Sequence, residues 1–139
     1  MAAAILVDAN VLLDILTADR RWLAWSSAEL RKAKAGGVVA VNPVICAEVA
    51  PAFEFDWAKL DEWLARAGLL KEPLPFAAST IAAAAHREYR RRGGSRETPL
   101  PDFYIGAHAE VAGHRLLTRD EARYATYFPK VTLIAPARE

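Results

Sequence analysis

Four carboxylic acids in this chain stand beside apolar segments, where a negative charge is costly unless it has a chemical role. They are Asp8, Glu48, Asp102 and Asp120. Carboxylates that are held close together repel one another unless a cation neutralises them. An all-oxygen ligand set without histidine or cysteine favours hard divalent ions. If the four residues converge, the expected chemistry is therefore the binding of Mg²⁺ or Mn²⁺.

The elements that would bring them together can be predicted from the hydrophobic pattern. Apolar runs of strand type occupy 5–7, 38–41, 69–71, 115–118 and 131–134, and helical patterns separate them at 11–16, 20–35, 43–50, 56–67, 76–92, 102–113 and 120–127. The strand runs do not alternate with polar residues, so both faces of each strand should be buried. This predicts a doubly wound fold, a three-layer α/β/α sandwich around a five-stranded parallel sheet.

In such a sheet the ligand crevice lies beyond the carboxyl ends of the strands. Asp8 and Asp120 directly follow predicted strands, and Glu48 lies in the second turn of the helix after another. Asp102 begins a helix, and positions 102, 105, 106, 109 and 113 lie on one face of it. Apart from the aspartate, the residues of this face are small or apolar, so the face should pack on the sheet. We therefore expect all four acids at one edge. Pro51 closely follows Glu48 and leaves the direction of its helix open.

Each acid also has a plainer interpretation. Asp8 and Asp102 could cap the helices that they begin, and Glu48 could be the solvent-facing residue of its helix. Asp120 could stabilise a first turn already capped by a box formed by Thr118 and Glu121. The histidines, at 86, 108 and 114, lack the spacing of a metal motif, and core or surface roles are expected for them.

Composition limits the class of protein. The 139 residues, 53% hydrophobic and with a net charge of +1, predict one globular domain over 1–139. A single cysteine, Cys46, allows neither an internal disulfide nor a thiolate zinc site. The first residues lack a basic n-region and no long uncharged apolar stretch occurs, so neither signal peptide nor membrane span is expected, and a cytoplasmic location is predicted.

Four segments together resemble the motif regions of PIN-domain ribonucleases, and most closely the toxin branch of VapBC toxin–antitoxin pairs. They are VDANVLLDIL at 7–16, PVICAEV at 43–49, PDFYIGAHA at 101–109 and LLTRDEARYATYFPKVTLIAP at 116–136. By this resemblance, the four acids match the acidic metal-binding quartet of the family, and Asn10 and Thr118 match the polar residues that support it. The resemblance also implies an RNA substrate, a cognate antitoxin partner and a homodimer.

The implied activity is endoribonuclease cleavage by a metal-activated water, with Asp8 and Asp102 as central ligands and Glu48 and Asp120 completing the site. RNA phosphates need a basic surface, and the arginine-rich segment before Asp102 is the candidate: Arg90, Arg91, Arg92 and Arg96. An alternative role for this segment is a helix C-terminus ending at Gly93 and Gly94. Six aromatic residues are expected mostly in the core, with some lining an antitoxin groove: Trp22, Trp25, Phe53, Phe55, Trp57 and Trp63.

Two other functions remain open from the sequence. A receiver-like phosphoacceptor domain also places acids beyond parallel strands, but no lysine ends the last strand run here. A catalytically silent PIN-like module would bind RNA or protein without cutting, although all four acids are present. Because Arg119 is the one basic residue adjacent to an acid in these motifs, mutual repulsion is predicted to raise the carboxyl pKa values of the quartet without metal.

Overall fold

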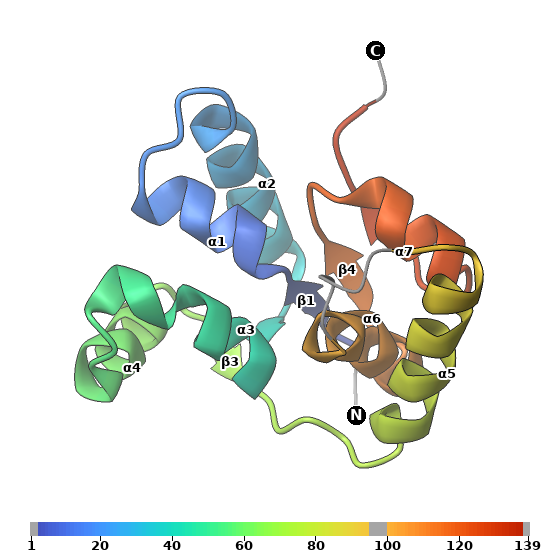
Figure 1. The fold of residues 1–139 in the computed structure, drawn as a ribbon. Coiled ribbons are helices and arrows are strands. Elements are labelled where there is room, and N and C mark those ends of the chain that lie inside the picture. Colours follow the sequence, from blue (N-terminus) through green and yellow to red (C-terminus); the bar gives the residue numbers. More distant parts are fainter. Residues whose placement is uncertain (1–2, 95–99, 138–139) are drawn as a thin grey trace.

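The computed structural model describes residues 3–94 and 100–137. Five strands form one parallel sheet in the order β3-β2-β1-β4-β5. Figure 1 shows the helices α1–α4 gathered on one side of the strands and α5–α7 on the other. The predicted three-layer α/β/α sandwich with a five-stranded parallel sheet is confirmed.

The strands are short and lie where the sequence predicts them, with some ends trimmed. They span β1 (Ile5–Val7), β2 (Val39–Val41), β3 (Leu70–Lys71), β4 (Arg115–Leu117) and β5 (Leu133–Ile134). Leu6 and Val7 of β1, Ala40 of β2 and Leu116 and Leu117 of β4 are fully buried. Burial on both faces accounts for the continuous apolar runs of the central strands.

The helices also follow the predicted pattern. They span α1 (Ala9–Leu16), α2 (Leu23–Gly36), α3 (Pro43–Val49), α4 (Trp57–Arg66), α5 (Ala78–Arg91), α6 (Pro101–Ala112) and α7 (Glu121–Tyr127). Pro51 does not kink α3 internally; the helix ends at Val49 and a 3-10 turn, Ala50–Phe53, follows. In the described part of the chain no helix has both the length and the apolar character of a membrane span.

Close packing of α6 explains its small residues. A Cβ atom added to Gly106 would lie 2.4 Å from the Phe128 ring, so the absence of a side chain lets this ring approach the helix. The helix ends at Gly113, whose φ of 69° lies in the left-handed region that favours glycine. Buried small residues thus bring α6 close to the sheet and set where its first turn, with Asp102, must lie.

The strand order has a reversal that matters for the site. From β1 the chain moves outward through β2 to β3, and it then crosses to the other side of β1 to form β4 and β5. The reversal therefore lies between the neighbours β1 and β4. In an open parallel sheet this is where a crevice forms beyond the carboxyl ends of the strands.

Candidate active site at the carboxyl edge of the sheet

Asp8 lies at this reversal and is held by three side chains. Its backbone amide donates to the carbonyl of Leu117 at 2.9 Å, which joins the ends of β1 and β4. Its carboxylate is only 5% exposed, and Oδ2 accepts from Thr118 Oγ1 at 2.8 Å, Tyr124 Oη at 3.1 Å and Asn10 Nδ2 at 3.3 Å. Asp8 occupies the N-cap position of α1 but makes no side-chain capping bond. The capping interpretation of Asp8 is therefore wrong.

Burial controls the ionisation of Asp8 and of its hydrogen-bond partner Tyr124. Burial raises the pKa of Asp8, and the hydrogen bonds from Thr118 and Tyr124 work against that rise. Burial and the neighbouring Asp8 charge in turn raise the pKa of Tyr124 well above its ordinary value. Tyr124 therefore remains a phenol that donates to Asp8. Sequence reasoning missed this residue, since nothing in its spacing distinguishes it from a core tyrosine.

Glu48 and Asp102 both line a cavity of about 410 Å³ between α3 and α6. The cavity is lined by Pro43, Val44, Ala47, Glu48, Pro101 and Asp102. Glu48 is exposed on α3, as the solvent-facing interpretation predicted. Its pKa is nevertheless raised to about 7, first by partial desolvation and then by the negative charges of Asp8 and Asp102. Three of the four acids therefore share one electrostatic environment. Asp102 lies in the first turn of α6, where Leu100 takes the N-cap position without a side-chain bond.

Asp120 has a capping role as well as a place at this edge. It is the N-cap of α7, and its Oδ1 accepts from the Arg123 amide at 3.4 Å. The box predicted with Thr118 as the cap is wrong, because the Thr118 hydroxyl is directed to Asp8 and also accepts from the Asp120 amide at 3.0 Å. Asp120 is thus joined to Asp8 through one hydroxyl.

The cation of the site is not the one that the sequence suggested. Arg119 points away from the quartet and binds Asp14 through Nε at 2.6 Å and Nη2 at 2.9 Å. Arg123 instead lies with Nε 3.4 Å from Asp120 Oδ2. Its charge also interacts with Asp8 and Asp102, and its own pKa is raised by these acids against the opposing effect of burial. The basic residue adjacent to Asp120 in sequence is therefore not the one whose side chain pairs with it.

The sequence as a whole carries a family signature that agrees with this geometry. The family model described as the PIN domain matches residues 5–129. The chain belongs to the PIN domain family. No curated protein matches it significantly.

Solved structures share the fold of this PIN domain at low sequence identity. VapBC2 from Rickettsia felis bound to a DNA fragment from its promoter has a TM-score of 0.72 and 14% identity, covering 96% of this chain and 99% of that one. A toxin–antitoxin complex from Klebsiella pneumoniae has a TM-score of 0.67 and 20% identity, covering 99% and 100%. FitAcB from Neisseria gonorrhoeae has a TM-score of 0.61 and 21% identity, covering 94% and 96%.

The donor set of this PIN domain fits a hard divalent ion. Asp8, Glu48, Asp102 and Asp120 supply only oxygen, the ligand type that such an ion prefers. Repulsion by Asp8 and Asp102 contributes to the raised pKa of Glu48, as predicted, although desolvation contributes more. The raised pKa of Asp8 has another cause, which is burial. The described residues contain one group of three possible metal ligands whose donor atoms all lie within 4.8 Å, and it is a different one: Glu72, His108 and His114.

Part of the arginine segment has structural partners. Gly93, with a φ of 84°, follows the C-cap of α5, as the helix-end interpretation predicts. Arg92 Nε pairs with Glu88 at 3.0 Å, and its guanidinium lies 5.7 Å from the centre of the Tyr127 ring. Arg90 and Arg91 are exposed and line a shallow hollow beside α6. The prediction for Arg96 lies outside the described residues.

The aromatic residues divide between core and surface. The rings of Phe53 and Trp63 pack at 5.6 Å, partly buried against the core. Trp22 and Trp25 stack edge to face at 6.0 Å, and the Arg119 guanidinium lies 5.0 Å from the Trp22 ring. Of the six residues named from the sequence, Phe55 and Trp57 are the largely exposed ones, at 78% and 55%.

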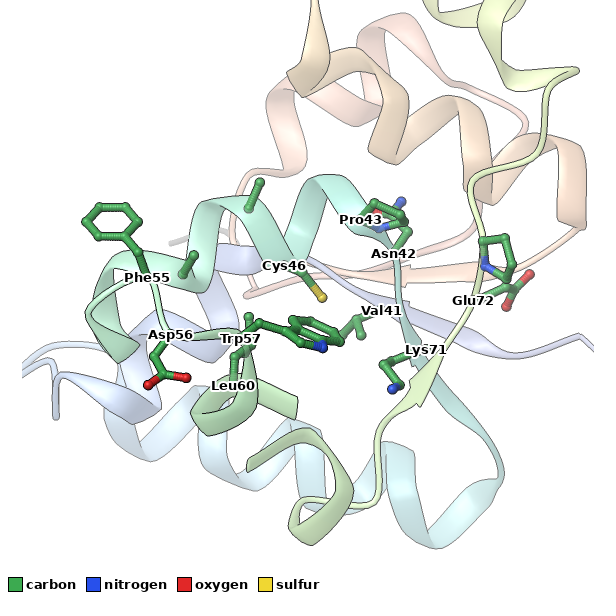
Figure 2. Close-up of a pocket in the computed structure, with 13 residues that line it drawn as sticks. Val41, Asn42, Pro43, Cys46, Phe55, Asp56, Trp57, Leu60, Lys71 and Glu72 are labelled. Carbon is green, nitrogen blue, oxygen red and sulfur yellow. The ribbon is translucent and has the colours of Figure 1, made fainter. Parts of the chain in front are cut away.

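Those two residues border an apolar pocket of about 570 Å³ between α3, α4 and the end of β3. Figure 2 shows Trp57 lying across this pocket opposite Cys46, with Phe55 at its outer rim. Lys71 and Glu72 form its polar side. The pocket adjoins the cavity that Glu48 lines, since Pro43 and Ala47 border both, but neither Glu48 nor Asp102 lines the pocket.

Proposed function

We propose that this PIN domain is a divalent-metal-dependent endoribonuclease, the toxin of a toxin–antitoxin pair. The observation that carries the proposal is the convergence of acids at the reversal of the sheet, where the Asp8 amide bonds the end of β4 and where Glu48 and Asp102 line one cavity. Toxin–antitoxin complexes are among the solved structures that share its fold. An all-carboxylate cluster has no nucleophile of its own, so hydrolysis must use water.

In this proposal Asp8 and Asp102 are the principal ligands of Mg²⁺ or Mn²⁺, and Glu48 and Asp120 complete the site. The bound ion would polarise a phosphodiester and lower the pKa of a water molecule. The role of this chain is to hold the ligands: Thr118, Tyr124 and Asn10 all bond Asp8 Oδ2, which leaves Oδ1 free of these three side chains. Such supporting hydrogen bonds orient ligands and tune their basicity.

The test is a gel assay of mixed RNA with purified protein in chelator, Mg²⁺ and Mn²⁺. We expect cleavage only with metal in the wild type and none from Asp102→Asn, since the substitution keeps the side-chain shape and removes the ligand charge. Glu62→Gln, an exposed acid on α4, is the matched control and should cut normally. Cleavage by Asp102→Asn, or none by the wild type in either metal, contradicts the proposal.

A catalytically silent RNA-binding module is the competing function. It predicts RNA binding in a mobility-shift assay without cleavage, and binding that persists in Asp102→Asn. The receiver-like alternative predicts phosphorylation of one aspartate by a small phosphoryl donor, and the PIN family match leaves it without support.

We propose that the apolar pocket beside Trp57 receives an apolar segment of the antitoxin. Exposed aromatic rings around a concave apolar surface are typical of partner sites. Co-expression of the cognate antitoxin should relieve growth arrest by the wild type but not by a Phe55→Ser, Trp57→Ala double variant. Relief that is unchanged in this variant removes the pocket from the interface. A homodimer is proposed on the family resemblance, with light scattering as its test.

A further inference from the structure

The cluster of Glu72, His108 and His114 lies outside the proposed active site and has a defined protonation state. Asn42 Oδ1 accepts from the Ile45 amide at 2.9 Å, which orients the Asn42 side chain. Its Nδ2 must then donate to His108 Nδ1, at 3.0 Å. Because Nδ1 of His108 accepts, the ring proton is on Nε2, which donates to Glu72 Oε1 at 3.2 Å.

His114 has the same tautomer for an independent reason. A backbone amide can only donate, and the Ala4 amide lies 2.9 Å from His114 Nδ1. The proton of this ring is therefore also on Nε2, which lies 2.9 Å and 3.0 Å from the two oxygens of Glu72. Two neutral imidazoles thus clamp one carboxylate, and these bonds lower the pKa of Glu72 in spite of the opposing effect of its burial.

This arrangement does not suit a metal ion, although the donor atoms are close enough for one. A metal would need the Nε2 lone pairs, so both ring protons would have to move to Nδ1. There they would face the Ala4 amide and the Asn42 amide group, which are donors themselves. Histidines that bind metal normally donate through their other ring nitrogen, the opposite polarity.

A hydrogen-bond relay from Asn42 through His108 to Glu72 joins α3 and α6, the helices that carry Glu48 and Asp102. Asn42 is the N-cap of α3, which carries Glu48, and His108 is a fully buried residue of α6, which begins beside Asp102. The two helices lie close together (Figure 1). Residues of both helices, Glu48 and Asp102 among them, line one cavity. A change at the relay must therefore alter how α3 sits against α6.

We infer that His108 is a positioning residue, which through Asn42 fixes α3 against α6 and so sets the separation of Glu48 and Asp102. The part concerning metal binding rests on the proposed function, whereas the tie between the helices does not. His114 also bonds Glu72, but its other ring nitrogen accepts from Ala4 and not from a residue of α3. Replacing His114 therefore removes a bond to Glu72 without removing the bond to Asn42, and it serves as the control.

Protonation of His108 at low pH should break the bond from Asn42. A second proton on His108 would occupy Nδ1 and face the Asn42 amide group. The titratable groups acting on it are Glu72 and His114, and burial lowers its pKa in spite of the opposing effect of Glu72. A lowered histidine pKa means that the unfolded state gains the proton first, so this contribution to stability is present above the unfolded value of 6.5 and is lost as pH falls below it.

The experiment compares His108→Phe, His114→Phe and His108→Gln. Glutamine keeps an acceptor for Asn42 and a donor for Glu72 but does not titrate. Calorimetric titration with Mn²⁺ should show affinity weakened by about tenfold or more in His108→Phe, within about threefold of wild type in His114→Phe, and largely restored in His108→Gln. Amide exchange in α3, which needs no metal, should be faster in His108→Phe alone.

Equal effects of the two phenylalanine variants on both measurements would overturn the positioning role. If the wild type binds no Mn²⁺, the proposed function fails while the exchange result still decides the tie between the helices. If His108→Phe does not fold, Asn42→Ser replaces it, since serine can still cap α3 but lacks the amide group that donates to His108. Faster amide exchange in α3 of this variant supports the tie, and exchange at the wild-type rate contradicts it. Zn²⁺ binding that survives Asp102→Asn but is lost in His108→Gln would make the cluster a metal site instead.

Discussion

Arg123 Nε lies 3.4 Å from Asp120 Oδ2, and the charge of this guanidinium also interacts with Asp8 and Asp102. Its side chain is 33% exposed. Arg119, which precedes Asp120 in sequence, donates two hydrogen bonds to Asp14 and lies over the Trp22 ring. Substituting each arginine in turn therefore separates two effects: loss of positive charge near the acids, for Arg123, and loss of a structural ion pair, for Arg119.

Arg123→Gln should bind Mn²⁺ more tightly than the wild type, by a factor of about three to ten, since a competing positive charge is removed. In chelator the variant should melt lower, and its stabilisation by added metal should be larger. Calorimetry and thermal melts measure both effects. Arg119→Gln should also melt lower but keep the wild-type metal affinity. If the two variants behave alike toward Mn²⁺, Arg123 is not the internal counter-ion.

Glu48 should make the metal-free protein less stable as pH rises. Its pKa is about 7 in the folded protein against 4.5 in the unfolded chain, so the folded state retains a proton that the unfolded state has lost. Stability in chelator should therefore fall from about pH 4.5 to pH 7 on this account. Glu48→Gln should flatten that part of the melting profile, and Glu62→Gln should leave it unchanged. A Glu48→Gln profile identical to the wild type contradicts the coupling of the acids.

Tyr124→Phe should keep the fold and weaken metal binding, because Asp8 loses one of the donors that orient its carboxylate. The loss of one buried hydrogen bond costs about 1 kcal/mol of unfolding free energy. Mn²⁺ affinity should fall by about tenfold, as for other residues that support metal ligands. Tyr127→Phe, on the same helix and packed against Phe103, is the control. Wild-type affinity in Tyr124→Phe would show that Thr118 and Asn10 suffice to hold Asp8.

Neutralising Arg90, Arg91, Arg92 and Arg96 together should weaken RNA binding and reduce the dependence of affinity on salt. Each lost phosphate contact lowers the slope of log affinity against log salt by about one unit. Because Arg92 already pairs with Glu88 and stacks on Tyr127, we expect its share to be the smallest of the described three. Neutralising four basic residues of α2 and α4 serves as the control: Arg31, Lys32, Lys34 and Arg66. Equal slopes in the two variants would leave the segment as a helix end only.

Local patterns in the sequence determined the layers of this protein. The residues at 5–7 and the leucines at 116 and 117 are consecutive apolar residues because these parts of the strands are buried on both faces, so the parallel sheet could be predicted without coordinates. The placement of Asp8 and Asp120 at one edge followed from parallel topology alone. Gly113 ended its helix as expected, because the left-handed turn there favours glycine.

Only the tertiary structure decided which partners each charge has. Arg119 is adjacent to Asp120 in sequence yet binds Asp14, while Arg123 reaches the quartet because it lies one helical turn further along α7. Likewise, Glu72, His108 and His114 have no recognisable spacing, and they meet because β3, α6 and the start of β4 converge. Hydrophobic patterns depend on nearby residues and can be read directly from the sequence. These hydrogen bonds and ion pairs instead depend on contacts between distant segments, which the spacing of residues along the chain does not predict.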